Sequence, residues 1–250
     1  MATNLAQALH EAGHEIVQVY SRTMASASAL AVRVGAVPLC DVGQVVADAD
    51  VYILAVKDDA LPELIPQLAA GRKARVMLHT AGSVPMDVFQ GMAFHYGVLY
   101  PLQTFSKDRR VSFAHLPMFV EGNDDEALAV AEQLATSVSD RVSRLSSPQR
   151  KYLHLAAVFA CNFVNHCYEL SAEQLAKHGI PFDVLLPLID ETAAKVHDMS
   201  PADAQTGPAI RYDETVIRMQ SQLLADNPLQ KDLYERMSLS IHQTAMKKND

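Results

Sequence analysis

Short apolar runs alternate with amphipathic segments over the first 146 residues of the chain. The runs are apolar throughout rather than at every second position, which is typical of parallel strands buried on both faces of a sheet. Strands are predicted at Glu15–Tyr20, Ala36–Asp41, Val51–Val56, Arg75–Thr80, Gly97–Tyr100, Leu116–Gly122 and Arg141–Leu145, and helices at Met24–Val34, Ala60–Ala70 and Glu126–Ser137. A doubly wound α/β domain over residues 1–146 follows from this order.

The pattern changes to helical spacing alone after residue 146. Ser147 is a candidate N-cap, Pro148 suits the first helical position, and Gly179 suits the position just past the end. They predict one helix of roughly thirty residues, well above the usual length. Further helices are predicted at Asp183–His197, Glu214–Leu224 and Leu229–Met246, with a loop at Ser200–Asp213. We therefore expect an all-helical domain over residues 147–250.

The first predicted element is a helix that begins at Ala2, stops at Gly13 and leads directly into the first strand. A helix followed at once by such a strand is the second half of a βαβ unit. The first half, a strand ending in a glycine-rich turn, is expected to precede Met1.

Composition places the chain among ordinary globular proteins. Of its 250 residues 49% are hydrophobic and 20% charged, and the formal net charge is −8. An acidic surface argues against nucleic acid and anionic membranes as partners. Three cysteines without a CxxC pair predict free, buried thiols. With neither a membrane-spanning run nor a signal-peptide pattern, we expect a cytoplasmic protein.

Several segments resemble a known family. "ADVYILAVKDDALPELIPQL" and "VMLHTAGSVPMDVF" are similar to strands and loops of pyrroline-5-carboxylate reductases and their relatives. "HYGVLYPLQTFS", "QRKYLHLAAVFACNFVNH", "LLPLIDETAAK" and "AQTGPAIRYD" resemble one branch more closely, the bacterial Rossmann-like family that carries domain of unknown function 2520. The resemblance runs from Met1 to about Leu224. It implies a nicotinamide-dependent oxidoreductase with a helical domain of the 6-phosphogluconate dehydrogenase C-terminal type.

Members of this family begin with a strand and a glycine-rich turn before a helix similar to "ATNLAQAL". The resemblance thus implies that about ten to twelve residues are missing before Met1. A misplaced start codon and a real deletion are the two explanations. The first is favoured because losing a central strand leaves two neighbouring strands with unpaired edges.

Candidate cofactor-binding residues lie at the predicted strand ends, since doubly wound domains bind ligands at the carboxyl ends of their strands. Ser21, Arg22 and Thr23 follow the first strand, where hydroxyls and an arginine suit a 2′-phosphate and favour NADP over NAD. The alternative is that Arg22 is only a solvated cation. The loops that should line the cofactor groove contribute Val56, Lys57, His79, Thr80, Gly82 and Ser83. Tyr100 is expected on a loop beyond them.

Candidate catalytic residues are His154 and Asn162 on the long helix and Arg211 in the loop before the third helix. At 100° per residue, His154, Cys161 and Asn165 share one stripe, and Asn162 lies next to it. A satisfied core histidine and a helix-packing asparagine are the alternatives. Arg211 suits a substrate carboxylate, but it could equally pair with Asp213.

We therefore expect an oxidoreductase that uses NADP and acts on a small molecule in the cleft between its two domains. His154 would exchange the proton, while Asn162 and Arg211 would position the substrate. Two alternatives remain open: a non-catalytic nucleotide- or metabolite-binding protein on the same fold, and an inactive truncated form. No metal-ligand spacing occurs in the sequence. The apolar residues between Val184 and Ile189, in the helix predicted at Asp183–His197, predict a homodimer formed through the helical domain. The alternative is that the helices from Glu214 to Met246 fold back and complete the core of a monomer.

Overall fold

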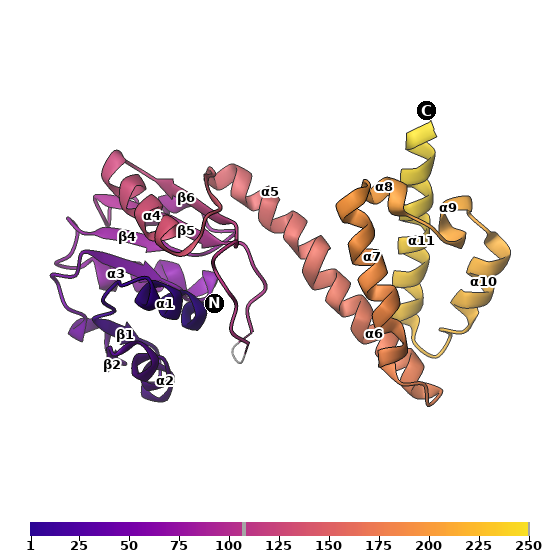
Figure 1. The fold of residues 1–250 in the computed structure, drawn as a ribbon, viewed down its shortest axis with the longest axis horizontal. Helices are drawn as coiled ribbons and strands as arrows, with labels where there is room; N and C mark the ends of the chain where they lie inside the picture. The colour runs from indigo at the N-terminus through magenta and orange to yellow at the C-terminus, as the bar shows by residue number, and fades with distance from the viewer. Residues whose placement is uncertain (107–108, 250) are drawn as a thin grey trace. The chain divides into compact units, whose positions relative to one another are not determined.

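The computed structural model describes residues 1–106 and 109–249; Asp250, the last residue of the predicted helical domain, lies outside them. Its contacts divide the chain into one unit at Met1–Cys161 and a second at Asn162–Asp250. The first unit is an α/β domain, and the second consists of helices (Figure 1). The predicted order, an α/β domain followed by a helical region, is confirmed.

Strands and helices alternate in the first unit much as the apolar pattern predicts. The order is α1 (Ala2–Glu11), β1 (Gln18–Tyr20), α2 (Met24–Val34), β2 (Val37–Leu39), β3 (Val51–Leu54), α3 (Leu61–Ala69), β4 (Val76–His79), β5 (His95–Pro101), β6 (Met118–Gly122), α4 (Asp125–Val138), β7 (Val142–Arg144) and α5 (Ser147–Ala157). Short 3₁₀ helices lie at Val42–Gln44, Asp58–Ala60 and Met86–Phe89. Most strands are shorter than the apolar runs that predict them, because the run ends lie in the connecting turns.

The strands form two sheets. One has five strands in the order β3-β4-β5-β6-β7, and the other pairs β1 with β2 in parallel. Within the described residues, β1 and β3 each pair with a single strand. The expectation of parallel strands throughout is wrong at one place, since β5 and β6 are antiparallel. Both runs are apolar because both strands are central in the sheet, so the pattern carries no information on direction.

Helices cover both faces of the five-stranded sheet. On one face, Leu5 and Leu9 of α1 join side chains of α4 around Leu78 and Leu99. On the other face, α3 and the 3₁₀ helix Met86–Phe89 pack on Met77 and its neighbours. Successive residues of a strand point to opposite faces, so His79 of β4 and Tyr100 of β5 share the second face. His79 stacks there on Phe89, with ring centroids 5.8 Å apart.

The long helix predicted after residue 146 is present but interrupted. It consists of α5, a π-helical segment at Val158–Phe163, and α6 (Val164–Lys177). Ser146, not Ser147, is its N-cap, and the Gln149 side chain accepts a hydrogen bond from the Ser146 backbone N–H at 3.2 Å. Both serines can cap a helix in sequence terms. Ser146 is the N-cap because the Ser147 hydroxyl instead forms hydrogen bonds with Glu121 and with the Met86 backbone N–H.

The second unit contains α6, a 3₁₀ turn at Phe182–Leu185, α7 (Leu186–Asp198), α8 (Pro201–Ala204), α9 (Pro208–Arg211), α10 (Glu214–Gln222) and α11 (Pro228–Asn249). The expectation of a loop over Ser200–Asp213 is wrong in part, since two short helices form there, each with a proline in its first turn. No described helix is long and apolar enough to cross a membrane.

Candidate functional site

A buried ion pair joins α5 to the sheet. Arg150 in the first turns of α5 lies 2.7 Å from a carboxylate oxygen of Glu121 on β6, with side-chain exposures of 1% and 13%. The same Glu121 carboxylate accepts hydrogen bonds from the Ser147 backbone N–H at 2.7 Å and from the Ser147 hydroxyl at 2.6 Å. Three charge-assisted bonds thus compensate for burying the carboxylate.

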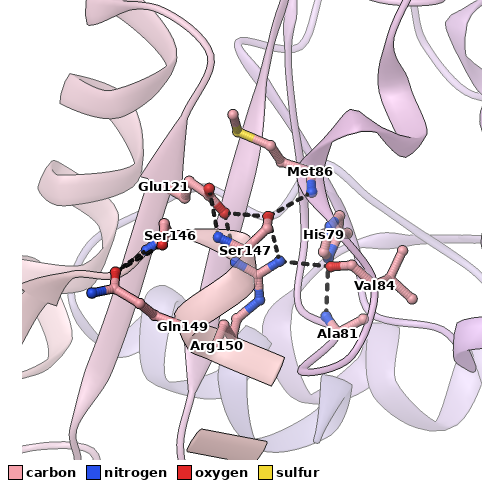
Figure 2. A network of polar contacts seen from close by, with 9 residues as sticks. All are labelled: His79, Ala81, Val84, Met86, Glu121, Ser146, Ser147, Gln149 and Arg150. Atoms are coloured by element: carbon pink, nitrogen blue, oxygen red, sulfur yellow. Dashed lines mark hydrogen bonds and ion pairs between the residues drawn. The ribbon is translucent and has the colours of Figure 1, made fainter. Parts of the chain in front are cut away.

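The loop after β4 joins this network (Figure 2). Arg150 donates to the Val84 carbonyl at 2.6 Å, and the Met86 backbone N–H donates to the Ser147 hydroxyl at 3.0 Å. Three segments distant in sequence, namely β6, the β4 loop and the start of α5, are therefore held together by side chains that are buried or nearly so. We call the group of Glu121, Ser147 and Arg150 the anchor. It fixes the position of the next turn of α5.

His79 lies beneath the same loop. Its side chain is fully buried, and its Nδ1 accepts a hydrogen bond from the Ala81 backbone N–H at 3.1 Å. Burial lowers the pKa of His79 to about 4, helped by the positive charge of Arg150 and opposed by the Pro85 carbonyl and Glu121. The imidazole is thus neutral near pH 7, and in the described structure its Nε2 has no hydrogen-bond partner of good geometry.

His154 lies one helical turn after Arg150 and pairs with a tyrosine. Its Nδ1 is 3.0 Å from the Tyr100 hydroxyl, and the two rings meet edge to face with centroids 6.2 Å apart. Burial raises the pKa of Tyr100; nearby Arg150 opposes this and Asp58 adds to it, so the phenol keeps its proton at neutral pH. Tyr100 belongs to β5, in agreement with the strand predicted at Gly97–Tyr100, and this corrects the expectation that it lies on the following loop.

Gly82, in the loop after β4, leaves room for the imidazole ring of His154. A Cβ atom at this position would lie 2.4 Å from Nδ1 of His154, closer than atoms can approach. The glycine is needed for this approach and not for its backbone conformation, because its φ lies outside the left-handed region. His154, Tyr100 and Gly82 thus form one compact group from α5, β5 and the β4 loop.

The remaining candidates of the first unit lie at strand ends, as predicted. Ser21 is half-buried after β1, where its backbone N–H donates to the Leu39 carbonyl at 3.0 Å, and Arg22 is exposed. Thr23 is the N-cap of α2 and accepts a hydrogen bond from the Ser26 backbone N–H, which gives it a structural role. Beyond β3 and β4, Val56 is half-buried, Lys57 and Ser83 are exposed, and Thr80 and Gly82 are buried.

Asn162 and Arg211 are exposed residues of the second unit. The expected stripe of His154, Cys161 and Asn165 assumes a continuous α-helix. The π-helical segment at Val158–Phe163 contradicts it, because a wider turn shifts the angular position of every later residue. Arg211 does not pair with Asp213 in the described structure; Asp213 instead caps α10 by accepting from the Val216 backbone N–H at 3.2 Å.

Sequence reasoning missed the anchor residues Glu121 and Arg150. The sequence did not single out Arg150, because Gln149 and Lys151 on either side of it are polar as well. Nothing in the sequence pairs it with Glu121, the second-last residue of β6. The cysteines also differ from expectation, since Cys40 and Cys161 are exposed. Among the described residues, no group of three or more His, Cys, Asp or Glu side chains could hold a metal ion.

Comparison with known proteins covers both units. The model of the Rossmann-like domain matches residues 1–103, and that of the domain of unknown function DUF2520 matches residues 116–241. A Bacteroides fragilis protein that carries the provisional description NADP oxidoreductase is 53% identical, with 97% of this chain and 94% of that chain covered and a TM-score of 0.93. No curated protein matches the chain.

More distant structures share the fold. A Thermotoga maritima protein is 21% identical with a TM-score of 0.72, covering 99% of this chain and 97% of that one. An imine reductase from Myxococcus stipitatus in complex with NADP+ is 14% identical with a TM-score of 0.69, covering 99% and 91%. A pyrroline-5-carboxylate reductase from Coxiella burnetii is 16% identical with a TM-score of 0.59, covering 98% and 94%. By its matching family model and the 53% identical relative, this chain belongs to the Rossmann-like family that carries domain of unknown function DUF2520.

Proposed function

We propose that the protein is an oxidoreductase that uses NADP in preference to NAD and acts on a small molecule. The observation that carries the proposal is the 53% identity, over 97% of this chain, to a protein provisionally described as an NADP oxidoreductase. The distant imine reductase was solved with NADP+, and a variant of it with NAD+, so the fold itself accommodates both nucleotides. The preference must therefore be argued from this chain's residues.

The hydrogen-bond donors of the residues that follow β1 suit a phosphate group. Arg22 is exposed and carries a permanent charge with several N–H donors, and the Ser21 hydroxyl is its neighbour. Thr23 acts mainly as the helix cap, so Ser21 and Arg22 would hold the 2′-phosphate. Main-chain groups of the loops after β3 and β4, at Val56, Lys57, Thr80, Gly82 and Ser83, would line the rest of the groove.

His154 is the residue proposed to exchange a proton with the substrate. NADPH, when bound, supplies a hydride, and a reduced carbonyl or imine also needs a proton. Imidazole is suited to this role because each of its two nitrogens can donate or accept a proton. Its position beside Gly82 places it at the loop that is proposed to line the cofactor groove. Asn162 and Arg211 remain candidates for holding the substrate.

The test is a fluorescence titration of the 250-residue protein with NADPH and NADH, followed by a turnover screen on carbonyl and imine compounds. NADPH should bind more tightly, and Arg22→Ala should remove most of that preference, about ten- to hundredfold, as one or two charged hydrogen bonds are lost. Arg33→Ala, an exposed arginine at the other end of α2, is the matched control. Equal affinities in the unmutated protein would refute the NADP preference, and saturable binding without turnover would indicate a non-catalytic binding protein.

We also propose that the protein is a homodimer formed through its helical unit. In the described structure α7 has no fully buried residue, and its Leu186, Leu188 and Val196 side chains are 47%, 63% and 50% exposed. A helix with this much exposed apolar surface is normally covered. A second copy of the same chain is the most common cover, because symmetric dimers dominate among oligomers.

Light scattering at tens of micromolar protein tests the dimer. The unmutated protein should have twice the chain mass, and Leu188→Glu should reduce it to one chain. Asp190→Asn on the same helix is the control and should leave the dimer intact. A single-chain mass for the unmutated protein would reject the proposal.

A further inference from the structure

We propose that Tyr100 is a positioning residue: its hydroxyl donates to Nδ1 of His154, and the neutral imidazole therefore carries its proton on Nε2. The catalytic role of this hydrogen bond rests on the proposed function, in which Nε2–H of His154 is the group that faces a substrate. The hydrogen-bond arrangement itself can be tested without cofactor or substrate.

The direction of the Tyr100–His154 hydrogen bond follows from the groups available. A neutral imidazole has one nitrogen that donates and one that accepts. Tyr100 keeps its phenolic proton because burial raises its pKa. In the described structure the hydroxyl has one hydrogen-bond partner, Nδ1 of His154 at 3.0 Å. If Nδ1 were the donor, the phenolic proton of the buried Tyr100 side chain would have no acceptor in the described structure, which is costly. The arrangement that satisfies both groups has Tyr100 donating.

The anchor network explains why the two side chains meet. Arg150 and His154 are four residues apart within α5, so they lie on the same face of the helix, one turn apart. Arg150 is held by Glu121 and the Val84 carbonyl, and that fixes the rotation of α5 about its axis. Tyr100 is held by its strand, β5. The backbones of both residues are therefore fixed relative to each other by the buried ion pair and the sheet.

Gly82 adds a second constraint on the imidazole. The ring of His154 fills the space that a Cβ atom at position 82 would occupy, 2.4 Å from Nδ1. Tyr100 on one side and the Gly82 backbone on another limit the rotation of the ring. The proton on Nε2 thus has a defined direction as well as a defined position. When it passes to a bound molecule, the phenolic proton of Tyr100 moves to Nδ1, so that the imidazole stays neutral and the phenol becomes a phenolate that water reprotonates.

The first experiment measures the tautomer of His154 by ¹⁵N NMR in the protein without ligands. We expect a single neutral form with the proton on Nε2. Tyr100→Phe should give a mixture of both tautomers, while Tyr96→Phe, a matched loss of a hydroxyl on the same strand, should leave the single form. An unchanged tautomer in Tyr100→Phe, or a proton found on Nδ1 in the unmutated protein, would overturn the inference.

The second experiment displaces the imidazole from position 82. Gly82→Ala should leave the fold intact, since the colliding atoms belong to a side chain that can rotate, yet it should separate His154 from Tyr100 and also give mixed tautomers. If a turnover assay exists, both variants should lower kcat by about tenfold or more with little change in KM. A normal kcat together with mixed tautomers would refute the role of His154 in the proposed function, but it would leave the hydrogen-bond assignment intact. A single unchanged tautomer in both variants would refute only the hydrogen-bond assignment.

Discussion

The α/β unit and the helical unit differ most in how they bury apolar side chains. In the first unit Met77, Leu78, Phe89 and Leu99 are fully buried, with many neighbours in two clusters. In the described part of the second unit, Ala209 is the single buried hydrophobic residue. The buried side chains there are otherwise polar, namely Ser221, Gln230 and Ser238.

Both units nevertheless form regular helices with ordinary caps. Local sequence preferences therefore work equally well in the two units, and the difference lies in tertiary packing. An α/β sheet with helices on two faces makes a core within one chain, whereas a thin layer of helices leaves one side uncovered. From this comparison we expect the α/β unit to be the more stable of the two, and the helical unit to gain stability from the dimer proposed above.

The largest effect is expected from breaking the buried ion pair of the α/β unit. Arg150→Met leaves the Glu121 carboxylate buried without its cation and should lower the free energy of unfolding by about 3–5 kcal/mol. Arg144→Met, which breaks the exposed pair with Glu132, is the control and should change little. Chemical denaturation measures both, and a similar loss in the two variants would contradict the assignment of the anchor.

A matched pair of leucines tests the comparison directly. Leu78→Ala creates a cavity in the α/β core and should cost about 3 kcal/mol. Leu188→Ala removes a side chain that is 63% exposed in the single chain. In dilute protein it should leave stability almost unchanged, but at higher concentration it should weaken the dimer. Native-state hydrogen exchange at two protein concentrations separates these effects; equal costs in dilute protein would show that the helical unit has a core of its own.

Acid should destabilise the α/β unit through His79. The pKa of this residue is about 4 when folded, below the ordinary value of 6.5. Between these values the unfolded chain binds the proton and the folded one does not, so stability falls as pH decreases through this window, by about 2 kcal/mol from pH 7 to pH 5. His79→Asn should remove this part of the pH dependence. The exposed His178 of the helical unit provides the control, and His178→Asn should leave the dependence as it is.

The smallest effects should be equal in the two units. Thr23 caps α2 in the first unit, and Asp213 caps α10 in the second, each by accepting one backbone N–H. Thr23→Ala and Asp213→Ala should each cost about 1 kcal/mol. Local hydrogen exchange at the two helix starts measures this. A much larger cost in one unit would mean that its cap also contributes to tertiary packing.

The sequence alone determined the order of the elements, because strand and helix patterns depend on the spacing of apolar residues within a few positions. It placed α2 at its observed bounds and located the strand ends where ligands of this fold bind. It also singled out His154. These features are local, because a given spacing of apolar residues within a short segment predicts the same type of element wherever it occurs.

Tertiary structure decided which of these residues meet. The antiparallel pairing of β5 with β6 and the burial of His79 both depend on contacts between distant segments. The pairing of Glu121 with Arg150, and of Tyr100 with His154, joins residues 29 and 54 positions apart. No local pattern specifies such pairs, because their free energy comes from excluding water at a place that exists only when the sheet and α5 have come together.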